Sequence, residues 1–191
     1  YNDYIIDRRR YYHTCPELSG EEKNTRAHLK EDLEALGITD IRDMVNCYGL
    51  VATIHGGKPG KTVGLRADTD ALSFQEETGL PFASCEPGKM HACGHDVHTA
   101  VLMGVLQEFN RSRDFEGTLL GLFQPGEECN PGGASLVLAE EPFADYDVRA
   151  VIGEHVEPSL EVGTFGFRAG KYMASSDELR FTVHGTGGHA A

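Results

Sequence analysis

The sequence predicts an α/β fold: a mixed, mostly parallel sheet with helices on both faces. Short apolar runs alternate with segments of helical periodicity between residues 50 and 153. Polar clusters follow three of the predicted strands, which is where ligand sites lie in open α/β sheets. With 191 residues, 40% hydrophobic and 25% charged, the chain has globular composition and is long enough for one core and the start of another.

The first predicted helix begins at Ser19, which forms a capping-box pattern with Glu22, and ends at Gly37. Its apolar positions are Leu29, Leu33 and Leu36. Two apolar runs follow, at 50–55 and 62–67. The turn-rich segment between them predicts a β-hairpin.

After the hairpin, strands and helices alternate. The expected order is strand 63–67, helix 99–109, strand 118–123, helix 133–140 and strand 150–153. Residues 177–184 then alternate apolar and polar side chains, which predicts a half-buried strand of a second domain. We expect the boundary near residues 169–174, giving domains at 1–170 and 171–191.

Charge and cysteine content exclude several classes of protein. The net charge of -13 and a pI near 5.0 disfavour a nucleic-acid partner, because both carry negative charge. No apolar run reaches the roughly 18 residues that span a bilayer, so no membrane partner is expected. Five scattered cysteines do not indicate a disulfide framework, and no signal peptide is apparent. These features predict a cytoplasmic protein.

Residues 91–98 contain three histidines, a cysteine and an aspartate, the side chains that bind zinc and similar ions. Cys93 and His95 are two positions apart, and Gly94 lets the backbone fold tightly between them. A plain helix start with exposed histidines is the alternative. We favour the metal site, because a helix start needs no such mixture of ligand types.

Three further polar clusters follow predicted strands. Glu127 and Glu128 are adjacent, so one can bind a metal while the other handles a proton. His155 is a candidate ligand, and either Asp68 or Asp70 could orient a ligand histidine. Taken singly, each has a plainer reading as a solvated turn, a structural histidine or a turn cap.

Taken together, Cys93, His95, Glu128 and His155 form a predicted divalent-metal centre, with Glu127 as general base. A second ion would explain the mixed ligand types. The cysteine favours zinc, whereas the carboxylates also accommodate manganese. Such a centre supplies a nucleophilic water by lowering the pKa of water from about 16 towards 7.

Five motifs carry a family resemblance, in the expected order. They are His13–Ser19, Leu65–Leu72, Met90–Asp96, Gln124–Glu128 and Gly187–Ala190. They resemble the amidohydrolase branch of the zinc aminoacylase/carboxypeptidase superfamily, which includes hippurate hydrolases, N-acetyl-amino-acid deacetylases and auxin-conjugate hydrolases. The resemblance covers essentially the whole chain.

The resemblance implies a zinc-exopeptidase-like catalytic domain with two zinc or manganese ions, acting on N-acyl amino acids or short peptides. It implies the same four metal ligands, Glu127 as base and Asp70 as a supporting carboxylate. His189 matches a histidine of a lid domain that reaches the other protomer's site, so a homodimer is expected through this α+β lid, which begins at residue 171.

Members of that branch are about twice as long and carry a last ligand histidine in their C-terminal part. We therefore expect these 191 residues alone to be weakly active or inactive. Three alternatives remain open. One is a metallo-dipeptidase or carboxypeptidase with the same machinery, another is a cysteine hydrolase with Cys93 as nucleophile, and the third is a truncated, non-catalytic metal-binding fragment.

Overall fold

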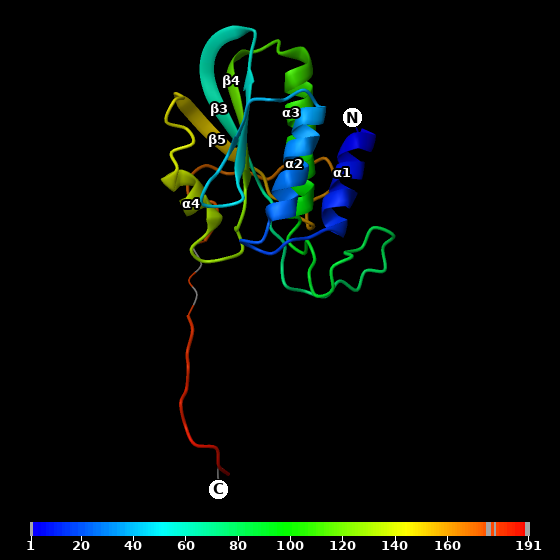
Figure 1. Ribbon diagram of the computed structural model, residues 1–191, viewed down its shortest axis with the longest axis vertical. Coiled ribbons are helices and arrows are strands. Elements are labelled where there is room, and N and C mark those ends of the chain that lie inside the picture. Colours follow the sequence, from blue (N-terminus) through cyan, green and yellow to red (C-terminus); the bar gives the residue numbers. More distant parts are fainter. Residues whose placement is uncertain (1, 175–176, 178, 190–191) are drawn as a thin grey trace. The chain divides into compact units, whose positions relative to one another are not determined.

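The computed structural model describes residues 2–174, 177 and 179–189 (Figure 1). Its helices and strands all lie before residue 154. In chain order they are α1 (Asn2–Thr14), α2 (Lys23–Ala35), β1 (Ile41–Asp43), β2 (Leu50–His55), β3 (Lys58–Asp68), α3 (His95–Ser112), β4 (Glu116–Gln124), α4 (Gly133–Ala139) and β5 (Val148–Gly153).

The strands form one mixed sheet in the order β1-β2-β4-β3-β5. β3 is parallel to β4 on one side and to β5 on the other. β2 pairs antiparallel with both of its neighbours, β1 and β4. The predicted fold class is therefore confirmed. The predicted hairpin is wrong, because β4 lies between β2 and β3 and pairs with both. β4 is apolar on both faces and buried along most of its length, so it takes a central place.

Helices cover both faces of the sheet (Figure 1). On β4, Leu119 and Phe123 point into a core shared with α1, α2 and α3. Leu120 and Leu122 point the other way, into a smaller core beneath α4. Alternate residues of a strand face opposite sides, which explains the division. Fully burying one such side chain contributes roughly 2 kcal/mol.

Two helix starts differ from the sequence prediction. The capping box is absent: Ser19 donates its hydroxyl hydrogen to the carboxylate of Asp70, and the Glu22 side chain does not cap α2. Glu17 does so instead, accepting the Thr25 backbone N–H at 2.6 Å. Helix α3 begins at His95, four residues before the predicted start. Helix α1 was not predicted, because only two of its residues are buried.

Contacts between residues divide the chain into a compact unit that ends at Val156 and a second unit that covers 157–191. The described residues of the second unit form no helix or strand. This includes the described part of 177–184, for which the sequence predicts a strand. A strand requires a partner, and no described segment pairs with these residues. The domain division at residue 170 stays a prediction.

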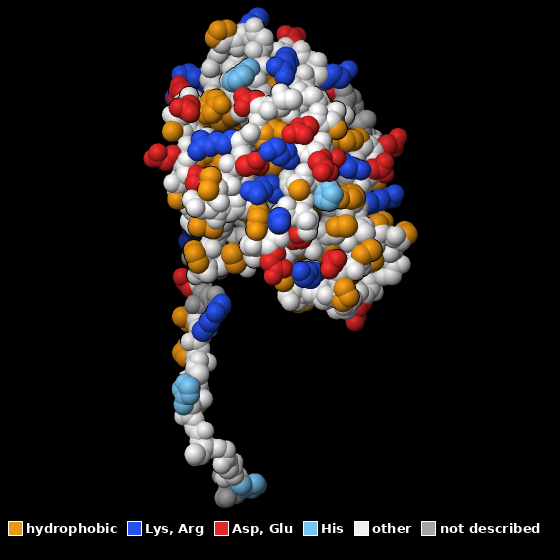
Figure 2. All heavy atoms as spheres, viewed as in Figure 1, with side chains coloured by type: hydrophobic (Ala, Val, Ile, Leu, Met, Phe, Trp, Pro, Cys, Tyr) orange, Lys and Arg blue, Asp and Glu red, His pale blue; other side chains and the backbone are white. Residues whose placement is uncertain are grey.

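Acidic and basic side chains are mixed over the face shown in Figure 2. Basic groups on that face lie among acidic ones rather than in one broad patch, in keeping with a net charge of -13. Among the described residues, no helix is both long and apolar enough to cross a membrane.

Candidate metal centre

The candidate site lies where three parallel strands end. Asp68 closes β3, Gln124 closes β4 and Gly153 closes β5. β3 lies between the other two strands and is parallel to both, so all three deliver their following residues to the same edge of the sheet. The start of α3 reaches the same edge. This topology gathers side chains that are up to 87 positions apart, from Asp68 to His155, at one place.

Cys93, His95 and His155 come together at this edge. One donor atom from each lies within 4.8 Å of the others, and Cys93 Sγ is 3.4 Å from His155 Nε2. Gly94, between the first two, has a φ of 90° and ends the loop at the first turn of α3. That left-handed conformation favours glycine and lets the thiol and the imidazole turn towards one point.

His95 also links this trio to the carboxylates. Its Nε2 atom is 3.8 Å from Glu127 Oε2 and 3.7 Å from Glu128 Oε1. Its Nδ1 atom faces two acceptors on Asp70, the backbone oxygen at 2.9 Å and Oδ1 at 3.2 Å, and therefore carries the hydrogen. The four predicted ligands, Cys93, His95, Glu128 and His155, thus belong to two groups that share His95.

The surroundings of His95 Nε2 indicate that the predicted ligands fit a cation. His95 Nε2 is buried and has no hydrogen-bond partner, an arrangement that costs free energy unless something binds there. Burial opposes charge on this ring, but Asp70 and the surrounding carboxylates outweigh it and raise the pKa of His95. The position therefore attracts positive charge, and its thiol, imidazole and carboxylate groups are the donors that zinc takes.

Asp70 connects the ring of His95 to the loop after β4 that carries Glu127 and Glu128, here called the acidic loop. Its Oδ2 atom accepts the Ser19 hydroxyl at 2.6 Å and the Glu128 backbone N–H at 2.9 Å. Burial alone would raise the pKa of Asp70, but the hydrogen bonds from His95, Ser19 and the backbone amides outweigh it and lower the pKa to about 2. The carboxylate is ionised at neutral pH and binds these neighbours. Its role as a supporting carboxylate, which the resemblance implies, stays a prediction.

Glu127 differs from Glu128 in its surroundings. Its side chain is 42% exposed, against 23% for Glu128. No hydrogen bond from another described residue fixes the Glu127 carboxyl group. Partial burial, followed by the neighbouring charge of Glu128, raises the pKa of Glu127. A partly exposed carboxyl group with a raised pKa, close to the predicted ligands His95 and Glu128, suits proton transfer.

The cysteine lies in an acidic environment. Burial first, and then Glu128 and Glu127, raise the pKa of Cys93 to about 12. The thiol is therefore protonated at neutral pH unless a cation takes the proton's place. This disfavours the alternative of a cysteine hydrolase, since a nucleophilic cysteine needs a lowered pKa.

Two buried residues, Asp68 and His98, adjoin His95, and one donor atom from each of the three lies within 4.8 Å of the others. Asp68 Oδ1 is 2.6 Å from His98 Nδ1, and Asp68 Oδ2 accepts a bond from Arg66 at 2.6 Å. Burial would raise the pKa of Asp68, but the His98 bond and the Arg66 charge lower it. Sequence reasoning assigns no role to His98. Its spacing of three from His95 on α3 places both rings on one face and could have indicated it.

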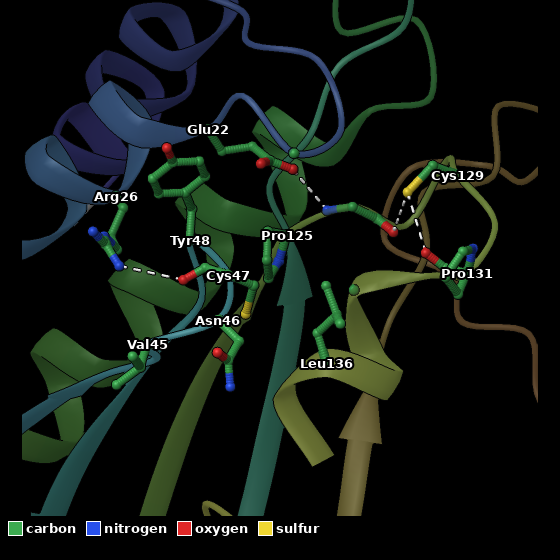
Figure 3. A pocket seen from close by; sticks show the side chains of 13 residues that line it. Glu22, Arg26, Val45, Asn46, Cys47, Tyr48, Pro125, Cys129, Pro131 and Leu136 are labelled. Atoms are coloured by element: carbon green, nitrogen blue, oxygen red, sulfur yellow. Dashed lines mark hydrogen bonds between the residues drawn. The ribbon is translucent and has the colours of Figure 1, made fainter. Parts of the chain in front are cut away.

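The acidic loop is also held from its far side (Figure 3). Glu22, at the start of α2, accepts the Gly126 backbone N–H at 2.7 Å, directly before Glu127. A cavity of about 280 Å³ lies on this side, between the loop, α2 and residues 45–48. None of the predicted ligands Cys93, His95, Glu128 and His155 lines this cavity. The cavity and the candidate metal centre are therefore separate features.

His189 lies in the second unit, where it is exposed. Its predicted contribution to a partner's active site stays a prediction.

Comparisons with known proteins show which family the chain resembles. Residues 64–189 match the family described as "Peptidase family M20/M25/M40". The chain is 40% identical over 190 residues to an N-acetyldiaminopimelate deacetylase of Listeria monocytogenes, covering all of this chain and 50% of that protein. It is 43% identical over 188 residues to an N-acetyl-L-cysteine deacetylase of Bacillus subtilis, covering 98% of this chain and 44% of that protein.

Among solved structures, the YXEP protein of Bacillus subtilis superimposes with a TM-score of 0.78 and 42% sequence identity. The superposition covers 83% of this chain and 44% of that one, whose description is a dinuclear metal-binding peptidase of the M20 family. The chain spans about half the length of the curated relatives it matches.

Proposed function

This chain belongs to peptidase family M20/M25/M40, and on that premise we propose that it forms the metal-binding part of an amidohydrolase. The proposed reaction is hydrolysis of the amide bond of N-acyl amino acids. One observation carries the proposal. Cys93, Glu128 and His155, from three separate segments, come together at His95, whose Nε2 atom is buried and unpartnered.

Each residue has a chemical role in the proposal. Cys93, His95, Glu128 and His155 hold one or two divalent cations, zinc or manganese. When bound, such a cation activates a water and polarises the substrate carbonyl. Glu127 takes the proton of the attacking water and passes it to the leaving nitrogen, which its raised pKa favours.

The substrate class comes from the relatives. Two similar proteins are named deacetylases of N-acetylated amino acids, at 40% and 43% identity. Both substrates carry an acyl group on the nitrogen of an amino acid, so this class is proposed here. Homodimerisation through residues 171 onward is part of the proposal, with His189 acting in the partner's site. Five cysteines without a disulfide fit a cytoplasmic location.

The decisive experiment separates the two adjacent glutamates. In a form that also carries the C-terminal half found in the longer relatives, we expect Glu127→Gln to retain its bound zinc but to lose at least about 100-fold in kcat, as general-base removal does. Glu128→Gln should lose zinc, measured by elemental analysis after dialysis. Glu34→Gln, on the exposed face of α2, is the matched control and should keep both metal and turnover. Full turnover in Glu127→Gln would refute the assignment.

A substrate panel tests the reaction class. The same extended form should hydrolyse N-acetyl-L-cysteine, N-acetyldiaminopimelate, N-acetylmethionine and hippurate. A chelator should abolish hydrolysis until zinc or manganese is added back. Cleavage of unblocked dipeptides alone would replace the proposal with a peptidase. Turnover that survives chelation would revive the thiol mechanism.

A further inference from the structure

His98 is fully buried on α3, next to the candidate metal centre but outside the predicted ligand set. Both of its ring nitrogens have protein partners. Nε2 lies 3.0 Å from the Val156 backbone nitrogen, which can only donate, so Nε2 accepts. Nδ1 therefore carries the hydrogen and donates it to Asp68 at 2.6 Å. The ring can bind a cation only by giving up one of these bonds.

The bond to Val156 leads directly to a predicted ligand. Val156 follows His155, whose Nδ1 lies 2.8 Å from the Val156 backbone oxygen. The rings of His98 and His155 also meet edge to face, with centroids 4.6 Å apart. His155 is exposed, and its printed contacts are this ring contact, the Val156 oxygen and Cys93. The bond to the Val156 oxygen engages Nδ1 and so leaves Nε2 facing Cys93.

Val156 also packs against the loop that carries Cys93 and His95. A Cβ added at Gly94, between Cys93 and His95, would collide with the Val156 side chain. The segment after β5 therefore rests on the ligand loop through Val156, and His98 fastens it there. Asp68 anchors the other side of His98, since it ends β3 and is itself held by Arg66.

We propose that His98 is a positioning residue that orients His155 for cation binding through the Val156 N–H, without binding the cation itself. The inference rests on the proposed function, because it takes His155 to be a ligand. It predicts that only one of the two bonds of His98 controls metal affinity: the bond to Val156.

Two conservative substitutions separate these bonds. In His98→Asn, the side-chain amide nitrogen replaces Nδ1 and keeps the Asp68 bond, but nothing accepts the Val156 N–H. In His98→Gln, the amide oxygen replaces Nε2 and keeps the Val156 bond, but Asp68 loses its donor. Zinc affinity of the metal-free protein is measured by competition with a chromophoric chelator. Urea unfolding of the same metal-free samples shows whether each variant is folded.

We expect His98→Asn to weaken zinc binding about 10- to 100-fold, as loss of a residue supporting a ligand does, and His98→Gln to weaken it much less. In a His155→Ala background, His98→Asn should have no further effect, because its target is gone. Equal losses in the two variants, or a loss from His98→Asn that persists without His155, would overturn the inference.

The same experiment distinguishes failure of the premise. If His155→Ala alone leaves zinc affinity unchanged, His155 is not a ligand and the proposed metal centre is wrong, and the inference falls with it. If His155→Ala weakens binding but His98→Asn weakens it independently, the metal centre stands and only the role of His98 is refuted.

Discussion

Replacing Asp70 with asparagine tests the support beneath the metal centre. The carboxylate accepts bonds from Ser19, His95 and the backbone of Glu128. Asparagine has the same shape but only one acceptor oxygen. Its NH₂ group must face at least one of these donors. Two hydrogen-bond donors, the NH₂ group and the group it faces, then point at each other with no acceptor between them.

The magnitude follows from the pKa. Folding lowers the pKa of Asp70 from 3.8 to about 2, and about 1.4 kcal/mol corresponds to each unit, so ionised Asp70 contributes about 2 kcal/mol. A lowered carboxyl pKa stabilises the fold above pH 3.8, and this is lost as the pH falls towards 2. At pH 7 the whole contribution is present, and Asp70→Asn removes it.

We therefore expect Asp70→Asn to unfold at lower urea concentration, by about 2 kcal/mol, and to bind zinc about 10- to 100-fold more weakly because His95 is less well oriented. Asp43→Asn is the control: it removes a half-exposed partner of Lys30, and such surface pairs contribute at most about 1 kcal/mol. Unchanged zinc affinity and an unchanged urea midpoint in Asp70→Asn would refute the reasoning.

Three further predictions concern the surrounding fold. A hydrogen bond to Asp96 is the main cause of the raised pKa of His13, so its contribution is complete below pH 6.5 and is lost as the pH rises through the raised value. The stability that His13→Gln loses in urea unfolding should thus shrink at higher pH; a constant loss would contradict this. Leu106→Ala should cost about 2–5 kcal/mol in the same assay, against less than about 0.5 for the exposed Leu138→Ala, and similar costs would contradict the assigned core. Burial raises the pKa of Glu22, so wild type should lose stability relative to Glu22→Gln as the pH rises above 4.5; the opposite trend would show that Glu22 gains from its charge.

Much of the fold was predictable because periodicity records burial. Apolar runs predicted β2, the inner part of β3 and β4, and the leucines at 29, 33 and 36 predicted α2. An apolar run also predicted β5, although its side chains are mostly exposed among the described residues. Helix α1 escaped because it buries only Tyr12 and His13 and shows no apolar stripe. The hairpin was wrong because a sequence shows which strands are neighbours along the chain, whereas pairing depends on which apolar surfaces meet. Here β4 came between β2 and β3.

For the candidate site, the donors could be read from residue types and their order: a thiol, imidazoles and paired carboxylates near the ends of predicted strands. Their geometry became known only from the folded chain. In the fold, His95 Nε2 has no hydrogen-bond partner, and Asp70 accepts a bond from Ser19 instead of capping a turn. Both ring nitrogens of His98 are hydrogen-bonded. The physical reason is that residue types and their order fix chemical capacity, whereas the identity of each hydrogen-bond partner depends on contacts between segments distant in the chain.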